Sequence, residues 1–361
     1  MFNLIRAVNK SMGLSKILAG AKGYIGIDIG STSVKIVELT KEGGIARLAT
    51  YGFSENSQVL QQGDLQKDVK NTAAIINNIC NQARVVNRNA VASLPTFSVF
   101  TSIINLSGVA KKDIPSATHW EAKKVIPLPL EEMMLDWKVI DDADQKDKKD
   151  TKVLLTGAPQ PLVKKYISIF KEAHINLLSL EPETFSLIRS LLGNDRSTIM
   201  LVEIGASTTD VSIVDNGIPM LNRSIDVGGL TITKAIGSHL NIGLERAEQF
   251  KYDMGISSIE SQTEVIPKTI VETISPIVNE MKYAIGLFSS KNNKKTEKII
   301  LSGGSALLPN LANYLTKVLD IKVIVGDPWS RISYPVDLKP LLNEIGPRMS
   351  VAIGLALREI E

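Results

Sequence analysis

Two short segments of the chain place a carboxylate, a glycine and small hydroxyl side chains in the same order. The first is DIGSTS at 28–33 and the second is EIGASTT at 203–209. Glycine lets the backbone approach an anion closely, so that successive N–H groups and hydroxyls can converge on it. A carboxylate beside a phosphate is suited to holding Mg²⁺, usually through water. Two such turns facing each other would grip a di- or triphosphate, with Asp28 and Glu203 on the metal side.

A third segment, LSGGSALLP at 301–309, places Gly303 and Gly304 between an apolar run and the start of a helix. Backbone without side chains can lie there against a flat ring, with N–H groups toward the ligand. Glu248 and Lys251 lie at helical spacing and could reach a ribose or a base. Together with the two turns, this segment predicts a nucleotide site.

Each segment has a plainer interpretation when it is taken alone. A DIGS turn is commonly an ordinary hairpin connection, an SGG pair commonly begins a helix, and Lys and Glu on a helix are usually solvated. Their joint occurrence in this order, with the first element repeated, favours the nucleotide site. The chain has neither a Walker GxxxxGK[ST] segment nor a GxGxxG that opens a helix after the first strand.

Strands are expected on both sides of the phosphate turns. Apolar residues alternate over 24–39, and 199–219 repeats that outline, which predicts a duplicated strand–turn–strand unit. Between the two units, strand 152–157, helix 160–173 and strand 175–180 predict a βαβ unit. Residues 141–152 are expected to form a solvated hairpin loop. Further helices are predicted at 70–83, from about 116 to Pro127, and at 229–241, 244–252, 262–290, 307–319 and 347–360, and further strands at 90–106, 137–140, 298–304 and 322–328.

Composition bounds the class of protein. The 361 residues are 44% hydrophobic and 22% charged, enough for one large or two moderate cores. We expect a cytoplasmic protein, because no apolar run approaches the roughly 20 residues of a membrane span and no signal-peptide pattern is present. Cys80 is the only cysteine, so it cannot form an internal disulfide. A formal charge of +3 and 5% aromatic residues give no reason to expect a nucleic acid partner.

Residues 1–22 form a separate basic segment. Four basic and no acidic residues accompany apolar residues at loosely helical spacing. Such a segment can lie on an anionic membrane surface, although it is more often a frayed terminus or a docking helix.

The phosphate and adenosine segments resemble those of the actin-like ATPase superfamily. GIDIGSTSVK is similar to its first phosphate loop, VEIGASTTDVSIV to its second, and IILSGGSALLPNL to its adenosine loop. Within the superfamily, the chain resembles the PilM family of type IV pilus assembly proteins from about residue 23 to the C-terminus. HWEAKKVIPLPLEEMMLDWKVI, EPETFSLIR, DVGGLTITKAI and VAIGLALRE carry that finer resemblance.

The resemblance implies an α/β, actin-like fold, which is a duplicated ribonuclease-H-like fold with two lobes around a nucleotide cleft. A small α+β subdomain would be inserted as in the cell-division protein FtsA. The first lobe would combine 23–85 with 154–197 and 347–361, the inserted subdomain would span 86–153, and the second lobe would span 198–346.

The resemblance also implies a ligand, ATP or ADP with Mg²⁺. The second loop of the superfamily usually begins Asp-Ile-Gly, so Glu203, which is longer by one methylene, would change the geometry for attack on the γ-phosphate. The matching residues are Gly30, Ser31, Thr32 and Lys35 in the first phosphate loop, Gly205, Ser207, Thr208 and Thr209 in the second, Gly229, Glu248 and Lys251 on the ribose side, Gly303 and Gly304 in the adenosine loop, and Asp28 and Glu203 beside the metal.

PilM-type proteins bind the short N-terminal cytoplasmic tail of PilN, a single-pass inner-membrane protein, in a groove beside the inserted subdomain. The resemblance thus implies a position at the inner face of the inner membrane, reached through partners. Contacts with other pilus proteins and self-association are compatible with it. Candidate groove or core residues are Trp120, Ile126, Leu128, Leu130 and Trp137, and we expect most of them in the core.

Three functions compete on this basis. We favour a cytoplasmic ATP-binding scaffold of type IV pilus assembly. An active ATPase or kinase is the second, but phosphoryl transfer needs a base or a water-positioning residue. The sequence identifies no such catalytic residue, so slow or absent hydrolysis is expected. A self-assembling, membrane-associated filament protein like FtsA is the third, and segment 1–22 would then have to supply the membrane contact.

Overall fold

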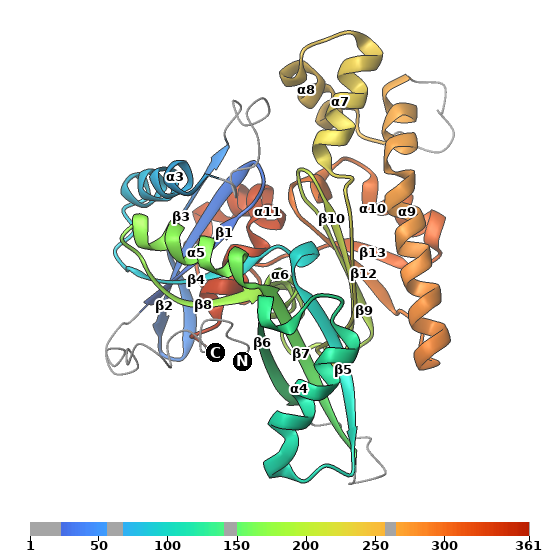
Figure 1. Cartoon of the computed structure of the whole chain (residues 1–361). Helices are drawn as coiled ribbons and strands as arrows, with labels where there is room; N and C mark the ends of the chain where they lie inside the picture. Colours follow the sequence, from blue (N-terminus) through green and yellow to red (C-terminus); the bar gives the residue numbers. More distant parts are fainter. Residues whose placement is uncertain (1–22, 56–67, 141–149, 257–264, 361) are drawn as a thin grey trace.

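A computed structural model describes residues 23–55, 68–140, 150–256 and 265–360 of the chain. Two five-stranded sheets stand side by side, and a three-stranded sheet projects beyond them (Figure 1). Segment 1–22 and most of the expected hairpin loop at 141–152 lie outside the described residues. Among the helices that are described, none combines the length and the apolar character needed to cross a bilayer.

The first sheet has the strand order β3-β2-β1-β4-β8. Its β1, β2 and β3 form an antiparallel meander, whereas β4 runs parallel to β1, and β8 parallel to β4. The strands are β1 (Gly23–Ile29), β2 (Ser33–Glu42), β3 (Ile45–Glu55), β4 (Asn89–Leu94) and β8 (Asn176–Pro182).

The second sheet has the same topology, with the strand order β11-β10-β9-β12-β13. Here β9, β10 and β11 form the antiparallel meander, and β12 and β13 are the parallel strands. The duplication predicted from the sequence is therefore confirmed. The strands are β9 (Ile199–Ile204), β10 (Thr209–Asp215), β11 (Ile218–Ile225), β12 (Lys298–Ser302) and β13 (Lys322–Val325).

Helices cover the outer face of each sheet. α3 (Val69–Gln82) and α5 (Gln160–Glu172) bury their apolar faces against the first sheet. Four helices pack on the second sheet: α7 (Gly229–Leu240), α8 (Leu244–Met254), α9 (Val265–Asn292) and α10 (Leu311–Leu319). Because both faces of the parallel strands are covered, these strands are nearly continuous apolar runs.

The inner faces of the two sheets meet across α6 (Glu183–Leu187), its π-helical continuation Ile188–Leu192, and α11 (Lys339–Leu357). Val351 and Leu355 of α11 share one buried cluster with Val91 of the first sheet and Leu201 of the second. α11 lies so close to β1 that a Cβ at Gly26 would collide with the Ala352 carbonyl. The two sheets and the helices between them therefore share one core.

The third sheet has the order β5-β7-β6, with β5 (Phe100–Ser107), β6 (Met133–Ile140) and β7 (Asp150–Pro159), and α4 (Ile114–Val125) packs on it. The predicted βαβ unit is wrong, because β7 belongs to this sheet while β8 pairs with β4 in the first sheet. The insert was predicted to span 86–153, but β4 lies in this range and belongs to the first sheet.

Two predicted helix starts shift in the structure. The last helix was expected to start at Pro347 but starts at Lys339. Pro340 lies in its first turn, where the missing N–H of proline would have had no partner within the helix. α10 starts at Leu311 rather than 307, because 3₁₀ turn Gly304–Leu307 precedes it. Further 3₁₀ turns are Thr96–Ser98, Lys111–Asp113, Leu130–Glu132 and Val336–Leu338.

Candidate nucleotide site between the two sheets

The two phosphate turns have the same internal bond and touch each other. The Gly30 N–H donates to the Ser33 carbonyl at 2.9 Å, and the Gly205 N–H donates to the Thr208 carbonyl at 2.9 Å. Ser31 Oγ lies 2.9 Å from Ser207 Oγ, so the turns meet where the two lobes face each other. The structure thus brings the two repeated segments together, as a shared anion would require.

The carboxylate of the first unit is paired within that unit. The antiparallel register sets Asp28 opposite Lys35, and Lys35 Nζ donates to Asp28 Oδ2 at 2.9 Å. Ser93 Oγ donates to the other oxygen of Asp28 at 3.3 Å. Burial lowers the pKa of Lys35, but Asp28, followed by Glu203 and Glu183, outweighs burial and holds that pKa above its ordinary value. The first turn therefore presents an ammonium group whose charge is largely balanced.

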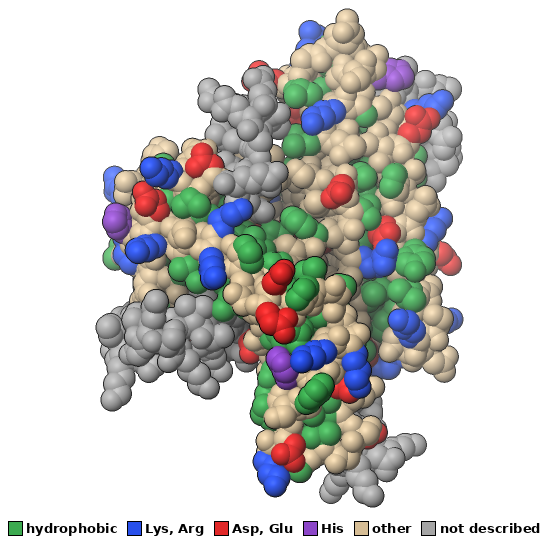
Figure 2. Space-filling model, viewed as in Figure 1, with side chains coloured by type: hydrophobic (Ala, Val, Ile, Leu, Met, Phe, Trp, Pro, Cys, Tyr) green, Lys and Arg blue, Asp and Glu red, His purple; other side chains and the backbone are tan. Residues whose placement is uncertain are grey.

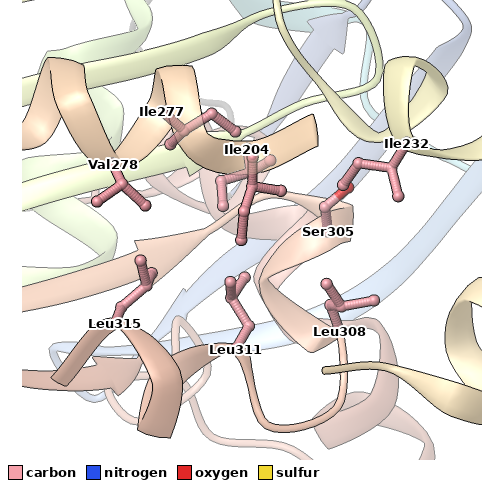
Figure 3. A pocket seen from close by; sticks show the side chains of 9 residues that line it. Ile204, Ile232, Ile277, Val278, Ser305, Leu308, Leu311 and Leu315 are labelled. Atoms are coloured by element: carbon pink, nitrogen blue, oxygen red, sulfur yellow. The ribbon is translucent and has the colours of Figure 1, made fainter. Parts of the chain in front are cut away.

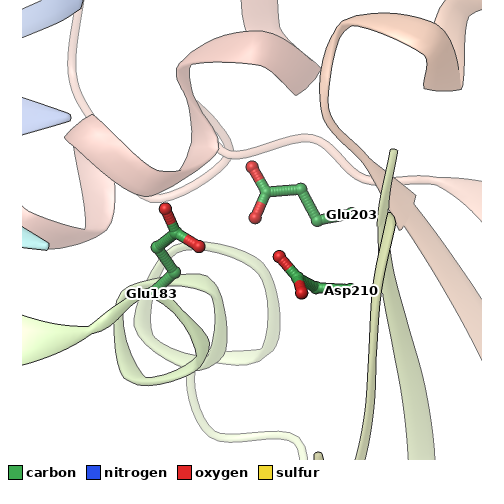
Figure 4. Close-up of side chains that lie close together, drawn as sticks. All are labelled: Glu183, Glu203 and Asp210. Atoms are coloured by element: carbon green, nitrogen blue, oxygen red, sulfur yellow. The ribbon is translucent and has the colours of Figure 1, made fainter. Parts of the chain in front are cut away.

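The carboxylate of the second unit faces another carboxylate. The register sets Glu203 opposite Asp210, and Glu183 at the start of α6 approaches both (Figure 4). Each of the three residues offers an oxygen within 4.8 Å of the others. Glu203 Oε2 and Asp210 Oδ1 are buried and have no hydrogen-bond partner among the described residues.

This acidic cluster, Glu183, Glu203 and Asp210, holds protons unusually well. Burial, with Asp28 and Asp210 close by, raises the pKa of Glu203 to about 8. Burial raises the pKa of Asp210 to about 6, although a hydrogen bond from the side chain of Ser224, opposite on β11, lowers it. Burial and the three neighbouring carboxylates also raise the pKa of Glu183 well above its ordinary value, although the Thr96 N–H donates to it at 3.2 Å. The cluster thus favours protons or a bound cation.

Gly229, Glu248 and Lys251, the predicted ribose side, lie together. The buried Lys251 Nζ donates to both Glu248 oxygens at 2.7 Å and to the Gly229 carbonyl at 3.3 Å. The Gly229 N–H in turn donates to the Gly205 carbonyl at 2.9 Å, which ties helix α7 to the second phosphate turn. Burial lowers the pKa of Lys251 and outweighs the opposing effect of Glu248. Glu248 remains 43% exposed, so its carboxylate can reach a ligand.

The adenosine segment lies against the second phosphate turn. Gly303 has φ +83°, and a Cβ there would collide with the Ile204 carbonyl, so glycine is required on both counts. Its N–H donates to the Pro347 carbonyl of α11 at 2.9 Å, and Tyr252 Oη donates to the Gly304 carbonyl at 3.3 Å. Ile204, just before the turn, lines a small apolar pocket together with side chains of α9 and α10 (Figure 3).

The residues that could contact a partner divide into two groups. Ile126 and Leu130 are core residues of the third sheet, and Trp137 packs partly buried against them. Trp120 is 66% and Leu128 47% exposed. In the space-filling view, hydrophobic side chains interrupt the charged surface of this subdomain (Figure 2).

A groove of about 600 Å³ runs beside the inserted subdomain. One wall is β6, an edge strand of the third sheet, and the other walls are α6 with its continuation and the turn between β10 and β11. Basic and apolar side chains line it, among them Lys138, Val139, Phe185, Ile218 and Arg331.

The family model for type IV pilus assembly protein PilM matches residues 26–360. This chain belongs to the PilM family. Among solved structures, the PilM–PilN type IV pilus biogenesis complex matches with a TM-score of 0.80 and 23% identity over 94% of this chain and 98% of that chain. MreB5 of Spiroplasma citri bound to AMPPNP matches with a TM-score of 0.51 and 13% identity over 93% of this chain and 95% of that one. Cell division protein FtsA of Bacillus subtilis is 21% identical over 356 residues, which are 84% of this chain and 78% of that protein. The fold is therefore actin-like, as predicted.

Two residues at the site of this PilM-family chain were missed by sequence reasoning. Asp210 follows Glu203 at the same interval at which Lys35 follows Asp28, so the repeat together with antiparallel pairing could have placed it. Glu183 gave no local signal, because only the packing of α6 between the sheets brings it to the second unit.

The geometry also bears on the metal assignment. Asp28, predicted to serve a metal, is paired with Lys35 and Ser93. Glu203 has an unpartnered oxygen, and so has Asp210. The site thus fits an anion at the turns and a divalent cation near Glu203, which are the charges of a metal–nucleotide complex.

Proposed function

We propose that this protein is a cytoplasmic nucleotide-binding scaffold of the type IV pilus assembly machinery. It binds ATP or ADP with Mg²⁺ and holds the cytoplasmic tail of a PilN-type inner-membrane protein. Membership of the PilM family supports the pilus role. The observation that carries the nucleotide is the contact between the two phosphate turns, with the ribose segment bonded to the second turn and the adenosine segment packed against it.

In this proposal, different groups of residues bind the phosphates, the ribose and the base. Hydroxyls and N–H groups of 31–33 and 207–209, together with Lys35, bind the phosphates, and Glu248 and Lys251 face the ribose. Gly303 and Gly304 leave room for the base. Mg²⁺ supplies charge neutralisation at the phosphates, and Glu203 is placed to hold it. Nucleotide entry must break the contact between Ser31 and Ser207, so binding is coupled to opening of the lobes.

Slow or absent hydrolysis follows from the acidic cluster. A carboxyl group accepts a proton from an attacking water only in its ionised form, and a raised pKa makes that form scarcer. Burial and the acidic neighbours of Glu183 raise its pKa well above the ordinary value.

A single-turnover assay tests the nucleotide half of the proposal. Excess protein is mixed with labelled ATP and Mg²⁺, and bound label and its conversion to ADP are followed over hours. Binding with negligible conversion is the expected result. Absence of binding contradicts the proposed function, and rapid conversion replaces the scaffold by an active ATPase.

The groove beside β6 is the proposed binding site of the PilN-type tail. An edge strand offers unpaired backbone groups to an extended peptide, and the apolar lining offers pockets for alternate side chains. A family relative has been solved as the PilM–PilN complex, which supports a partner of this kind. Through this partner the protein would reside at the inner face of the inner membrane.

Matched variants test the groove with a synthetic tail peptide and fluorescence anisotropy. Ile218→Arg, in the groove, should weaken binding by about tenfold or more. Trp120→Ala, on the exposed patch, should leave it unchanged. Weakening by Trp120→Ala alone would place the tail on the patch instead.

Similarity to FtsA keeps filament formation as a second candidate function. Sedimentation of the protein with ATP and Mg²⁺ tests it, since filaments pellet and a monomeric scaffold does not.

A further inference from the structure

We propose that Arg331 is a latch that holds together the two chain crossings between the lobes and so restrains lobe opening. The chain crosses between the two sheets through residues 193–198, before β9, and again through residues 326–338, after β13. Arg331 lies on the second crossing and is bonded to the segment that leads into the first. The proposal rests on the two-lobed fold and does not depend on nucleotide binding.

The first crossing passes through Gly193. On one side of it, Leu192 is buried in the cluster between the two sheets. On the other side, Thr198 is bonded to the second lobe, since its N–H donates to Glu297 Oε1 at 2.9 Å and its hydroxyl donates to Asp215 Oδ1 at 2.8 Å. Gly193 has φ +55° and ψ −113°, a conformation that L side chains rarely adopt. Such a residue at the end of an element can absorb the backbone rotation of a hinge.

The second crossing is fixed to the first lobe on both sides of Arg331. Trp329 is 1% exposed within the cluster formed by β2 and α11, and its Nε1 donates to the Leu342 carbonyl at 2.9 Å. The Ser333 N–H donates to the Ala46 carbonyl at 2.9 Å, beside β3. The backbone of Arg331 is therefore held by the first lobe, and its side chain reaches across to the first crossing.

The guanidinium group of Arg331 covers the hinge glycine. Its Nη1 donates to the Arg189 carbonyl, in the π-helical turn before Gly193, at 2.9 Å. A Cβ on Gly193 would lie 3.0 Å from Arg331 Nε and 3.1 Å from its Cδ and Cζ, so this planar group lies against the glycine backbone. Rotation about Gly193 must therefore displace the guanidinium group. Arg331 is exposed, so shortening its side chain leaves no cavity in the core.

Paired spin labels test the latch in the full chain without nucleotide. Cys80→Ala removes the native cysteine, and Asn78→Cys on α3 and Lys234→Cys on α7 place one label on each lobe, both at exposed positions. Double electron–electron resonance should give a narrow distribution of distances between the labels. Arg331→Ala should broaden that distribution, because the lobes then open more often. Arg246→Ala, which removes an exposed arginine that lies over the Phe250 ring within α8, is the matched control and should leave it unchanged.

A second variant tests the contact from its other side. Gly193→Ala should also broaden the distribution, because its Cβ displaces the guanidinium group. Added to Arg331→Ala, it should change little more, because the group that it displaces is already gone. Fully additive broadening by the two substitutions would overturn the proposal, as would equal distributions for Arg331→Ala and the control.

Thermal unfolding separates a lost latch from a damaged fold. Arg331→Ala should melt within about 2 °C of the labelled parent protein, because the side chain is exposed. A lower melting temperature with an unchanged distance distribution would give Arg331 a purely structural role and would also overturn the proposal.

Discussion

The two strand–turn–strand units share a topology and a turn but differ in the residue opposite the carboxylate. In the β1–β2 unit, Lys35 faces Asp28 and forms an ion pair at 2.9 Å. In the β9–β10 unit, Asp210 faces Glu203 at the same register position. One unit balances its own charge, and the other needs a proton or a cation. The same backbone arrangement therefore has different electrostatics in the two units, because one holds Lys35 where the other holds Asp210.

Breaking the balanced unit should have the largest effect. Lys35→Ala leaves the 4%-exposed Asp28 without its charge partner, which should lower the free energy of unfolding by about 3–5 kcal/mol. Urea unfolding measures it. The control is Lys294→Ala, which breaks a pair whose lysine is 52% exposed and should cost less than about 1 kcal/mol. Equal losses in the free energy of unfolding would show that the buried Asp28–Lys35 pair stabilises the fold no more than the exposed control pair does.

The unbalanced unit should make stability depend on pH. Glu203 and Asp210 have folded-state pKa values of about 8 and about 6, above their ordinary values of 4.5 and 3.8. The unfolded chain releases these protons at lower pH, so their contribution is fully present below about pH 4 and is lost as the pH rises through about 8. Metal-free protein should therefore be less stable at pH 8 than at pH 5, as followed by urea unfolding.

Asp210→Lys gives the second unit an ammonium group opposite its carboxylate, as in the first unit, and tests the same difference between the units. With an ammonium opposite Glu203, the loss of stability between pH 5 and pH 8 should largely disappear. A slope equal to that of the wild type would mean that other groups cause the pH dependence.

A smaller effect is expected from the way each turn is supported. A Cβ at Gly228 would lie 2.6 Å from the Ala206 carbonyl of the second turn, whereas a Cβ at Gly30 would meet only the end of Lys35, at 3.1 Å, and the Ser33 carbonyl at 3.2 Å. Gly228→Ala should therefore destabilise by about 1–3 kcal/mol, and Gly30→Ala by less, in thermal or urea unfolding. The reverse order would contradict the rigid support assigned to the second turn.

The smallest effect should come from the contact between the units. Ser207→Ala removes an exposed hydroxyl bond and should change stability by no more than about 1 kcal/mol. Release of a fluorescent nucleotide should become faster, because the Ser207 hydroxyl is among the groups proposed to bind the phosphates. Unchanged or slower release would contradict the phosphate role assigned to Ser207.

The turns, the duplication and most helices and strands could be predicted from the sequence. Alternation and turn chemistry act over a few residues, so DIGSTS and its repeat could be placed between strands before any packing was considered. Antiparallel pairing then makes the partners of Asp28 and Glu203 a local consequence of the turn length.

The sheet that each strand joins and the position of Glu183 depend on contacts between distant parts of the chain. β7 and β8 flank one helix, yet they belong to different sheets, because pairing depends on partners distant in the sequence. Trp120 and Trp137 are equally apolar as residues, yet one is exposed and the other packs against the core of the third sheet. Glu183 meets Glu203 and Asp210 because α6 is enclosed between both sheets, and long-range packing of that kind leaves no local pattern in the chain.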